Sequence, residues 1–349
     1  MRLLISTTLF LFLSLQCVFA GNPDRQGEAG AYELLMNPWA RSAGLHTLST
    51  SMVQGVESMR INIAGLPRIT STEIKLSNAQ YLTGTGISMN ALGIAQRMGK
   101  DKNSAFGISL MALGMGEIDV TVVNLPEGTG ATFTPAFFHL GIGYAHLFEN
   151  KVSVGILLRA VSESISDVTA FGLGIDAGVQ YVTGDRDNFK FGISIRNVGT
   201  PMKFGGPGMS IQNDATNPEV SYPLTYDQRA NRFELPSMLN IGLSYDFYLR
   251  ESLRLSTLGN FTSNSFSRDQ VGVGVEFGMN EKFMLRAAYK YELGEVADGQ
   301  ANVYTGLSAG ASVVVNLKKG EVSGLMLDYA YRMTSPFGGT HNISLGYKF

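Results

Sequence analysis

Hydrophobic and polar side chains alternate with a period of two along most of the chain, from about Thr72 to its end. This period places successive side chains on opposite faces of a β-strand. In the last segment one face carries Ile343, Leu345, Tyr347 and Phe349, and the residues between them are small, polar or charged. The pattern therefore predicts strands with one apolar face and one face of Gly, Ser and charged residues.

The alternation predicts about fourteen strands, most of them long enough for the 9–11 residues that a tilted membrane strand needs. Their expected spans are 72–82, 86–98, 104–117, 131–147, 151–164, 168–182, 188–199, 233–248, 252–263, 267–279, 282–292, 301–317, 321–333 and 339–349.

The connections between these strands alternate in length. Every second one is short and polar, such as 99–103 and 280–281, and those between are more variable, up to the long stretch 200–232. Outer-membrane barrels have this asymmetry, with short periplasmic turns and longer extracellular loops. We therefore predict an all-β fold, a transmembrane antiparallel β-barrel over residues 72–349, with both chain termini on the periplasmic side. A soluble β-sandwich or a propeller is the alternative.

The composition favours the barrel over these alternatives. Charged residues make up 16% of the chain, against roughly 25% in soluble domains, whereas a soluble sandwich would need a more charged exterior. No repeat of blade length indicates a propeller. Lys and Arg number 27 against 29 Asp and Glu, so no basic surface is available for nucleic acid.

Residues 1–20 have the features of a secretory signal peptide. Arg2 precedes an apolar run, and Ala20 places a small residue before the expected cleavage site. A membrane anchor is the alternative, but polar residues interrupt the run and leave it short for a helical span. We expect cleavage and a location in the bacterial outer membrane. Cleavage would remove Cys17, the only cysteine, which excludes disulfides, iron–sulfur clusters and cysteine catalysis.

Residues 21–71 lack sustained alternation. A fourteen-stranded barrel has a lumen too wide for its own side chains to fill, so we expect this segment to form a plug or hatch inside it. A periplasmic extension is the alternative. Several inward-facing glycines would let a plug approach the wall closely, because they carry no side chain. They are Gly172, Gly174, Gly178, Gly272, Gly274 and Gly278.

The same segment carries a family resemblance. The stretches from Gly30 to Leu35 (GAYELL) and from Pro38 to Gly44 (PWARSAG) resemble the opening of the PorV/PorQ family. Residues 62–66 (NIAGL) are similar to the family's next motif, with Ile63 in place of its proline. The resemblance implies a fatty-acid-transporter-like outer-membrane barrel associated with type IX secretion. The positions that carry it, which form the expected plug motif, are Pro38, Trp39, Arg41, Gly44, Asn62 and Gly65.

Charges of both signs fall on the inward face of the predicted strands, which indicates paired networks that brace the wall or plug. They are Arg159, Arg196, Arg286, Lys290, Arg332, Lys348, Asp176, Asp246, Glu276 and Asp328. We expect no catalytic residues, metal or cofactor. The pattern G-x-S-x-G at 306–310 lies within a strand rather than at a strand–helix elbow, and His139 and His146 face opposite sides of one strand.

The long stretch 200–232 is the expected partner-binding loop. Loops of this length without their own secondary structure are usually functional or disordered. We single out Phe204, Pro207, Tyr222 and Tyr226, because apolar and aromatic residues on an external loop suit a protein partner. A loop that merely caps the barrel is the alternative.

Three hypotheses about function follow. The first is a non-enzymatic outer-membrane barrel that, as the resemblance implies, binds type IX secretion components or the C-terminal signal domains of secreted cargo. The second is a transporter of hydrophobic solutes, with a ligand in the lumen and an exit at a strand kink. The third is a lipid-modifying enzyme, which needs a Ser–His pair on the lipid-facing surface; His341 is its nearest candidate.

Overall fold

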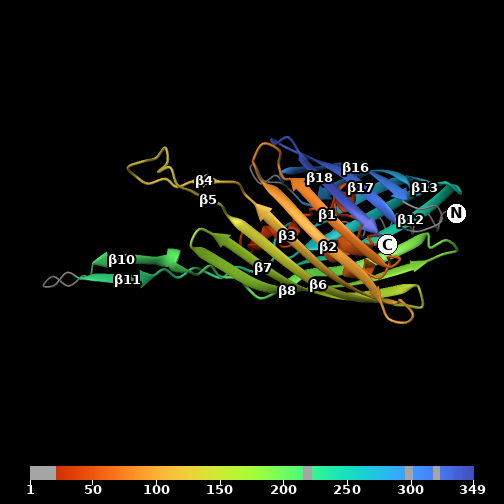
Figure 1. Ribbon diagram of the computed structural model, residues 1–349, viewed down its shortest axis with the longest axis horizontal. Coiled ribbons are helices and arrows are strands. Elements are labelled where there is room, and N and C mark those ends of the chain that lie inside the picture. The colour runs from red at the N-terminus through yellow and green to blue at the C-terminus, as the bar shows by residue number, and fades with distance from the viewer. Residues whose placement is uncertain (1–20, 215–221, 295–301, 317–322) are drawn as a thin grey trace, which may run out of the picture.

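The computed structural model describes residues 21–214, 222–294, 302–316 and 323–349. The expected signal peptide at 1–20, and residues 215–221 of the long loop, lie outside the described residues. Within the described part of the chain, a closed 14-strand antiparallel β-barrel forms (Figure 1), as the alternation predicted. The first strand closes the barrel by pairing with the last, with Leu76 opposite Leu345.

The barrel strands have nearly the expected spans. They are β1 (Thr72–Gln80), β2 (Ser88–Met98), β3 (Ser104–Gly114), β6 (Ala136–Phe148), β7 (Val152–Ile165), β8 (Val168–Thr183), β9 (Phe189–Gly199), β12 (Met238–Arg250), β13 (Leu253–Asn264), β14 (Gln270–Met279), β15 (Phe283–Glu292), β16 (Tyr304–Asn316), β17 (Gly324–Thr334) and β18 (Thr340–Lys348). Each pairs with its neighbours in the chain order, so the topology is up-and-down throughout.

Side-chain exposure alternates along these strands, and the apolar face is the outer one. In β8 nearly every second residue is exposed, including Phe171, Leu173 and Ile175. The polar face is buried in the lumen, where Arg159 and Asp176 are nearly inaccessible. Closure pairs the backbone groups of every strand, which is the condition for crossing hydrocarbon without helices.

The two ends of the barrel differ. At one end, which we call the turn end, the described connections are short, as at 149–151 between β6 and β7 and 280–282 between β14 and β15. The opposite end, the loop end, carries two additional hairpins (Figure 1). They are β4 (Ile118–Asp119) with β5 (Thr132–Phe133), and β10 (Ser210–Asp214) with β11 (Pro223–Asp227).

The β10–β11 hairpin differs from the expectation that 200–232 has no structure of its own. Its strands are short, and all their residues are exposed except Leu224, which is half-buried. Because neither face of this hairpin is buried, the sequence has no reason to alternate there, and the period of two fails as a signal. In Figure 1 the hairpin projects well beyond the barrel.

Residues 29–71 lie inside the barrel and are folded into short helical turns. Including the turn that precedes them and one in the long loop, these are η2 (Pro23–Arg25), η3 (Tyr32–Leu35), α2 (Ala40–Ala43), η4 (Gly55–Glu57), α3 (Ser58–Ile61), η5 (Ile63–Gly65) and η6 (Pro207–Met209). No helix among the described residues has the length and apolar character needed to cross a membrane.

The path of this segment corrects the expectation that both chain termini lie on the periplasmic side, that is, at the turn end. Gly21 lies against Asp269 in a loop-end connection, and Gly30 donates a backbone hydrogen bond to Glu234. The described chain therefore starts at the loop end and runs through the lumen to β1 at the turn end. An even number of strands does place the start of the first strand and the end of the last strand on the same side of the membrane. The strand count says nothing about a segment that passes through the lumen before the first strand.

The segment packs most closely against the wall at inward-facing glycines of the strands. A Cβ added to Gly178 would lie 2.0 Å from Asn62 Oδ1, and one added to Gly272 would lie 2.5 Å from Leu48 Cδ1. The expectation that inward glycines allow a close approach is thus confirmed at these two positions. On the side of β1, β2, β3 and β6, a hydrophobic cluster that includes Trp39, Val56 and Met59 fills the lumen.

Candidate functional site

The residues of the expected plug motif hold the N-terminal segment to opposite sides of the lumen. The Pro38 carbonyl accepts hydrogen bonds from Ser77 and Asn342 on β1 and β18. On the far side, the Asn62 side chain donates to the carbonyls of Thr50 and Val179, at 2.9 and 3.1 Å. This amide therefore ties two parts of the segment to β8.

The other motif residues support these contacts. Trp39 is buried in the hydrophobic cluster, and Gly44 fits between Arg286 and Gly310 of the wall. Gly65 lies so close to the Val53 carbonyl that a Cβ would be 2.1 Å from the oxygen. The motif thus serves packing, and its residues do not converge on one site.

Arg41 takes part in a cluster of charges in the lumen, towards the turn end of the barrel. Its guanidinium donates to the carboxylate of Glu276 at 3.1 Å, and those of Arg254 and Arg286 contact the same carboxylate at 3.0 and 3.1 Å. The Glu276 side chain has no exposed surface. The neighbouring carboxylate raises the pKa of Arg41 above its ordinary value. A shared carboxylate thereby joins α2 of the segment to three barrel strands.

A second polar cluster lies nearer the loop end. Arg60 donates to the carbonyl of Met36 at 2.8 Å, and the Glu33 carboxyl lies 3.1 Å from the His139 imidazole. Burial raises the pKa of Glu33 above its ordinary value. In the first cluster, charges of opposite sign are paired across the boundary between segment and wall, as the mixed inward charges predicted. In the second cluster, the contact across this boundary is the hydrogen bond between the Glu33 carboxyl and the His139 imidazole of β6.

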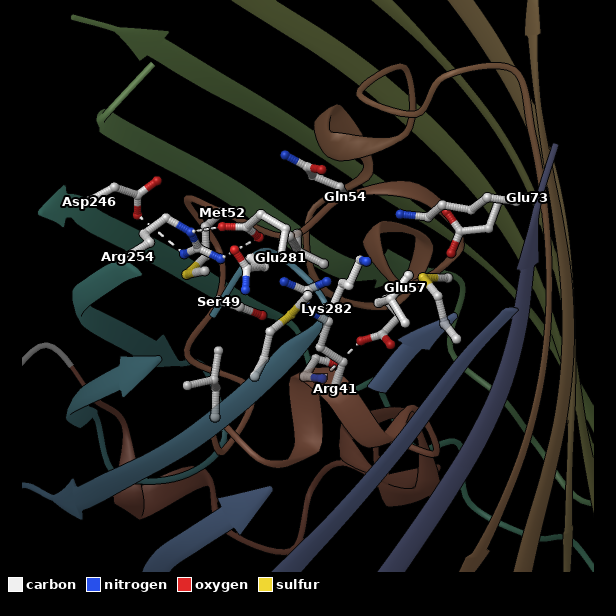
Figure 2. Close-up of a pocket in the computed structure, with 18 of the residues that line it drawn as sticks. Arg41, Ser49, Met52, Gln54, Glu57, Glu73, Asp246, Arg254, Glu281 and Lys282 are labelled. Atoms are coloured by element: carbon white, nitrogen blue, oxygen red, sulfur yellow. Dashed lines mark hydrogen bonds and ion pairs between the residues drawn. The ribbon is translucent and has the colours of Figure 1, made fainter. Parts of the chain in front are cut away.

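A cavity of about 970 Å³ opens between the segment and the wall at the turn end. Figure 2 shows Arg254 turned toward Asp246 and Glu281 on one side of it, and Glu57 and Glu73 on the other. Arg254 contacts Glu281 at 2.7 Å. Because its lining is dominated by charged and amide side chains, the cavity suits water and polar groups rather than a hydrocarbon.

Several residues of this cavity were missed by the sequence reasoning, which singled out lumen charges only on some strands. Lys75 pairs with Glu57 and, at 2.7 Å, with Asp328. The alternation along β1 does place Lys75 on the inward face, so its position could have been predicted from the sequence. The position of Glu57 could not, because the side chains of a short helical turn inside the lumen show no periodic pattern that would distinguish one face from another.

An apolar hollow of about 490 Å³ lies in the wall of β1, β2, β3 and β18. Exposed side chains such as Leu76, Phe138 and Ile343 line it. Since these side chains point outward, most of its apolar lining belongs to the lipid-facing surface and not to the lumen.

The expected loop residues separate into two groups. Phe204 packs against Phe233 with tilted rings whose centroids are 5.7 Å apart, and both pack against a buried cluster that includes Leu34 and Met202. Pro207 starts η6 below the hairpin.

Tyr222 and Tyr226 lie at β11 and are 47% and 45% exposed. In the other hairpin, Val123 is 99% exposed and Leu125 is 53% exposed. The loop end therefore presents apolar side chains to water on both projecting hairpins.

The residues considered for catalysis are engaged otherwise. Ser308 of the G-x-S-x-G pattern is buried and donates to the Gly44 carbonyl at 3.1 Å. His341 is hydrogen bonded to the Tyr329 hydroxyl at 2.8 Å. No metal-binding group of three or more His, Cys, Asp or Glu side chains occurs among the described residues.

One Ser–His pair does exist. Ser104 Oγ lies 2.8 Å from His146 Nδ1, because the two residues are directly opposite on β3 and β6. The same hydroxyl lies 3.0 Å from that of Tyr144. Within the described hydrogen bonds no carboxylate reaches His146, so the pair lacks the group that orients a catalytic histidine.

Solved structures with the same fold include a FadL homologue and two toluene transporters. The Pseudomonas aeruginosa FadL homologue has a TM-score of 0.56 at 12% identity, covering 90% of this chain and 99% of its own. The Pseudomonas putida toluene transporter TodX has a TM-score of 0.55 at 13% identity, with 89% and 97% covered. For the Ralstonia pickettii toluene transporter TbuX the values are 0.54 and 15%, with 90% and 98% covered. At these identities the likeness establishes the fold alone.

No curated protein sequence matches the chain. A family model does: residues 74–347 match the type IX secretion system membrane protein PorP/SprF. The match supports the expected secretion system, although under a different family name from PorV/PorQ, and it does not include the opening segment on which that resemblance rested. The chain belongs to the PorP/SprF family of type IX secretion system membrane proteins.

Proposed function

We propose that this protein is a non-enzymatic outer-membrane component of type IX secretion whose loop end binds proteins, either other secretion components or the C-terminal signal domains of cargo. The observation that carries the proposal is the pair of hairpins that project from the loop end with exposed apolar side chains (Figure 1). Family membership and the apolar outer face support a location in the outer membrane.

The attachment of the N-terminal segment inside the lumen supports a binding role over a transport role. The segment at 29–71 is tied to β1, β8, β14 and β18 by buried hydrogen bonds and ion pairs. We infer that it is a permanent plug rather than a hatch that opens, because displacement would leave several charges buried without partners. The resemblance of its opening to PorV/PorQ is consistent with this role.

The alternative, a transporter of hydrophobic solutes, has the fold likeness in its favour. It requires an apolar pocket inside the barrel, whereas the large lumen cavity is charged and the apolar hollow has lipid-facing side chains along it. The strand kink that it also requires is available at the register shifts between β8 and β9, between β12 and β13 and between β16 and β17, so the charged lining of the lumen cavity is the observation that counts against transport.

Removing the β10–β11 hairpin tests the proposal. Gln228 donates its backbone N–H to the Met209 carbonyl at 2.8 Å, so replacing residues 210–227 with Gly-Gly closes the gap with a short turn. We expect normal amounts of heat-modifiable barrel in the outer membrane, and loss of co-purification with the C-terminal signal domain of a protein that the same organism secretes.

A matched deletion serves as the control. Val120 donates to the Ala131 carbonyl at 2.8 Å, so residues 121–130 of the other hairpin can be removed in the same way. We expect this variant to retain binding. Unchanged binding after removal of both hairpins would contradict the proposal.

The export route belongs to the same proposal. We infer that residues 1–20 are a signal peptide that is cleaved before Gly21. Mass spectrometry of the protein from outer membranes should find Gly21 at its N-terminus, and an intact Met1 would contradict it.

A further inference from the structure

The β10–β11 hairpin has two free edges, and its register determines which backbone groups face outward. The Met209–Gln228 pair is hydrogen bonded, and such pairs alternate along an antiparallel ladder. The register therefore makes Ile211–Tyr226 and Asn213–Leu224 the hydrogen-bonded pairs within the hairpin.

The remaining residues direct their N–H and C=O groups away from the hairpin. On β10 these are Ser210, Gln212 and Asp214, and on β11 they are Pro223, Thr225 and Asp227. Pro223 has no N–H. The β10 edge thus offers a complete set of donors and acceptors, whereas the β11 edge is interrupted by a residue typical of protected edges.

In the described part of the chain, no other strand pairs with either edge. A two-stranded ribbon in water is marginally stable by itself, and a free edge is a template for another strand. A third strand added to this hairpin would find a full set of backbone donors and acceptors on the β10 side only.

The two faces of the hairpin differ in chemistry. Directly opposite residues share a face, so Ile211, Tyr226 and Leu224 lie on one side, with Ile211 and Tyr226 42% and 45% exposed. The other face carries Asp214 and Asp227. A strand added to β10 would match these faces with apolar side chains on one side and polar or basic side chains on the other.

We propose that a protein partner binds by adding an extended strand of this alternating character to the free edge of β10. The inference rests on the proposed function, since it assigns a recognition mode to the same loop-end surface. Backbone hydrogen bonds to the β10 edge supply affinity, and the two faces supply selectivity.

A matched pair of proline substitutions tests this in the full-length protein. Gln212 and Thr225 are directly opposite, and neither N–H is used inside the hairpin. Gln212→Pro therefore removes a donor from the β10 edge, and Thr225→Pro removes its counterpart from the β11 edge. The probe is the purified C-terminal signal domain of a protein secreted by the same organism, and the readout is its Kd for the detergent-solubilised barrel.

We expect Gln212→Pro to weaken binding by roughly tenfold or more, because proline removes one hydrogen bond and obstructs the strand beside it. Thr225→Pro should bind like the parent protein. Hydrogen exchange at Ile211 and Tyr226, whose N–H groups bond within the hairpin, checks that each variant keeps its fold. Any variant that loses this protection is remeasured with the hairpin locked by a Ser210→Cys and Asp227→Cys disulfide, a pair that uses no bond of the ladder.

The outcomes separate the two proposals. If the parent protein binds the probe and both proline variants bind equally well, strand addition is overturned and the proposed function stands. Loss in Thr225→Pro alone, or equal loss in both folded variants, overturns the assignment to β10. If the parent protein does not bind, cargo binding itself fails. A dimer of the parent protein that Gln212→Pro dissociates would instead identify a second copy of this chain as the occupant and overturn the partner assignment.

Discussion

At the scale of single residues, Glu276 connects the N-terminal segment to the wall. Three guanidinium groups, those of Arg41, Arg254 and Arg286, contact one carboxylate that has no exposed surface. Desolvating four charges is costly, and only their mutual attraction offsets that cost. The arrangement is therefore sensitive to the loss of the shared anion, more than to the loss of any one cation.

We predict that Glu276→Gln destabilises the folded barrel by about 3–5 kcal/mol, since it removes the carboxylate with which Arg41 and the buried Arg286 are paired, whereas Arg254 keeps Asp246 and Glu281. Urea titration of the purified protein, followed by the mobility shift between folded and unfolded barrel on gels, measures the change. Glu281→Gln is the matched control, because Glu281 contacts Arg254 but is 60% exposed; its effect should be below about 1 kcal/mol. Equal stability of the two variants would contradict the role assigned to Glu276.

At the scale of elements, the N-terminal segment contacts the strands closely at glycines, because a glycine has no side chain to keep the segment away from the wall. Gly178 of β8 faces Asn62, and Gly272 of β14 faces Leu48. Gly174 also faces inward on β8, but a Cβ there would meet its nearest neighbour at an ordinary 3.4 Å. Two glycines on one strand thus differ in what they contact, although their sequence pattern is the same.

Gly178→Ala should force the Asn62 side chain away from β8, because the new Cβ would lie 2.0 Å from its oxygen. The hydrogen bonds of Asn62 to Thr50 and Val179 are then lost, so the segment loosens while the barrel stays closed. Limited proteolysis in detergent should cut within residues 29–71 at least several times faster than in the parent protein, with a wall that still shows heat-modifiable mobility. Gly174→Ala should be cut at the parent rate. Protection of both variants to the same degree would show that the segment can retreat from β8 without cost.

At the scale of the whole molecule, the distribution of side chains is inverted relative to a water-soluble protein. Leu158 is 57% exposed on the outer face of β7, while the next residue, Arg159, is buried in the lumen. Ile211 is 42% exposed as well, but it lies on the projecting hairpin. Exposed apolar residues therefore occur in two environments, on the outer wall of the barrel and on a hairpin that projects beyond it.

Arginine substitutions distinguish these environments. Leu158→Arg places a charge near the middle of a membrane strand, where it costs about 2–4 kcal/mol, whereas Ile211→Arg places one in water. Folding yield into lipid vesicles should fall for Leu158→Arg and remain at the parent level for Ile211→Arg. Equal yields would show that β7 does not face hydrocarbon.

The sequence by itself determined the barrel. A period of two is a local property. The alternation of apolar and polar residues within a single strand, such as β8 or β18, is enough to predict which face contacts lipid and which faces the lumen. Strand number, the alternation of connection lengths and the inward position of charges such as Asp176 and Glu276 all follow from that local pattern. A family resemblance in the first part of the chain indicated the secretion system, which the family match supports.

Only the tertiary structure decided what lies inside and beyond the barrel. The path of the N-terminal segment from the loop end, the sharing of Glu276 by three arginines and the cavity around Lys75 depend on contacts between residues far apart in the chain. The β10–β11 hairpin likewise carries no alternation, because both of its faces are in water. Periodicity records a boundary between two environments, so it cannot specify elements that lie wholly within one of them.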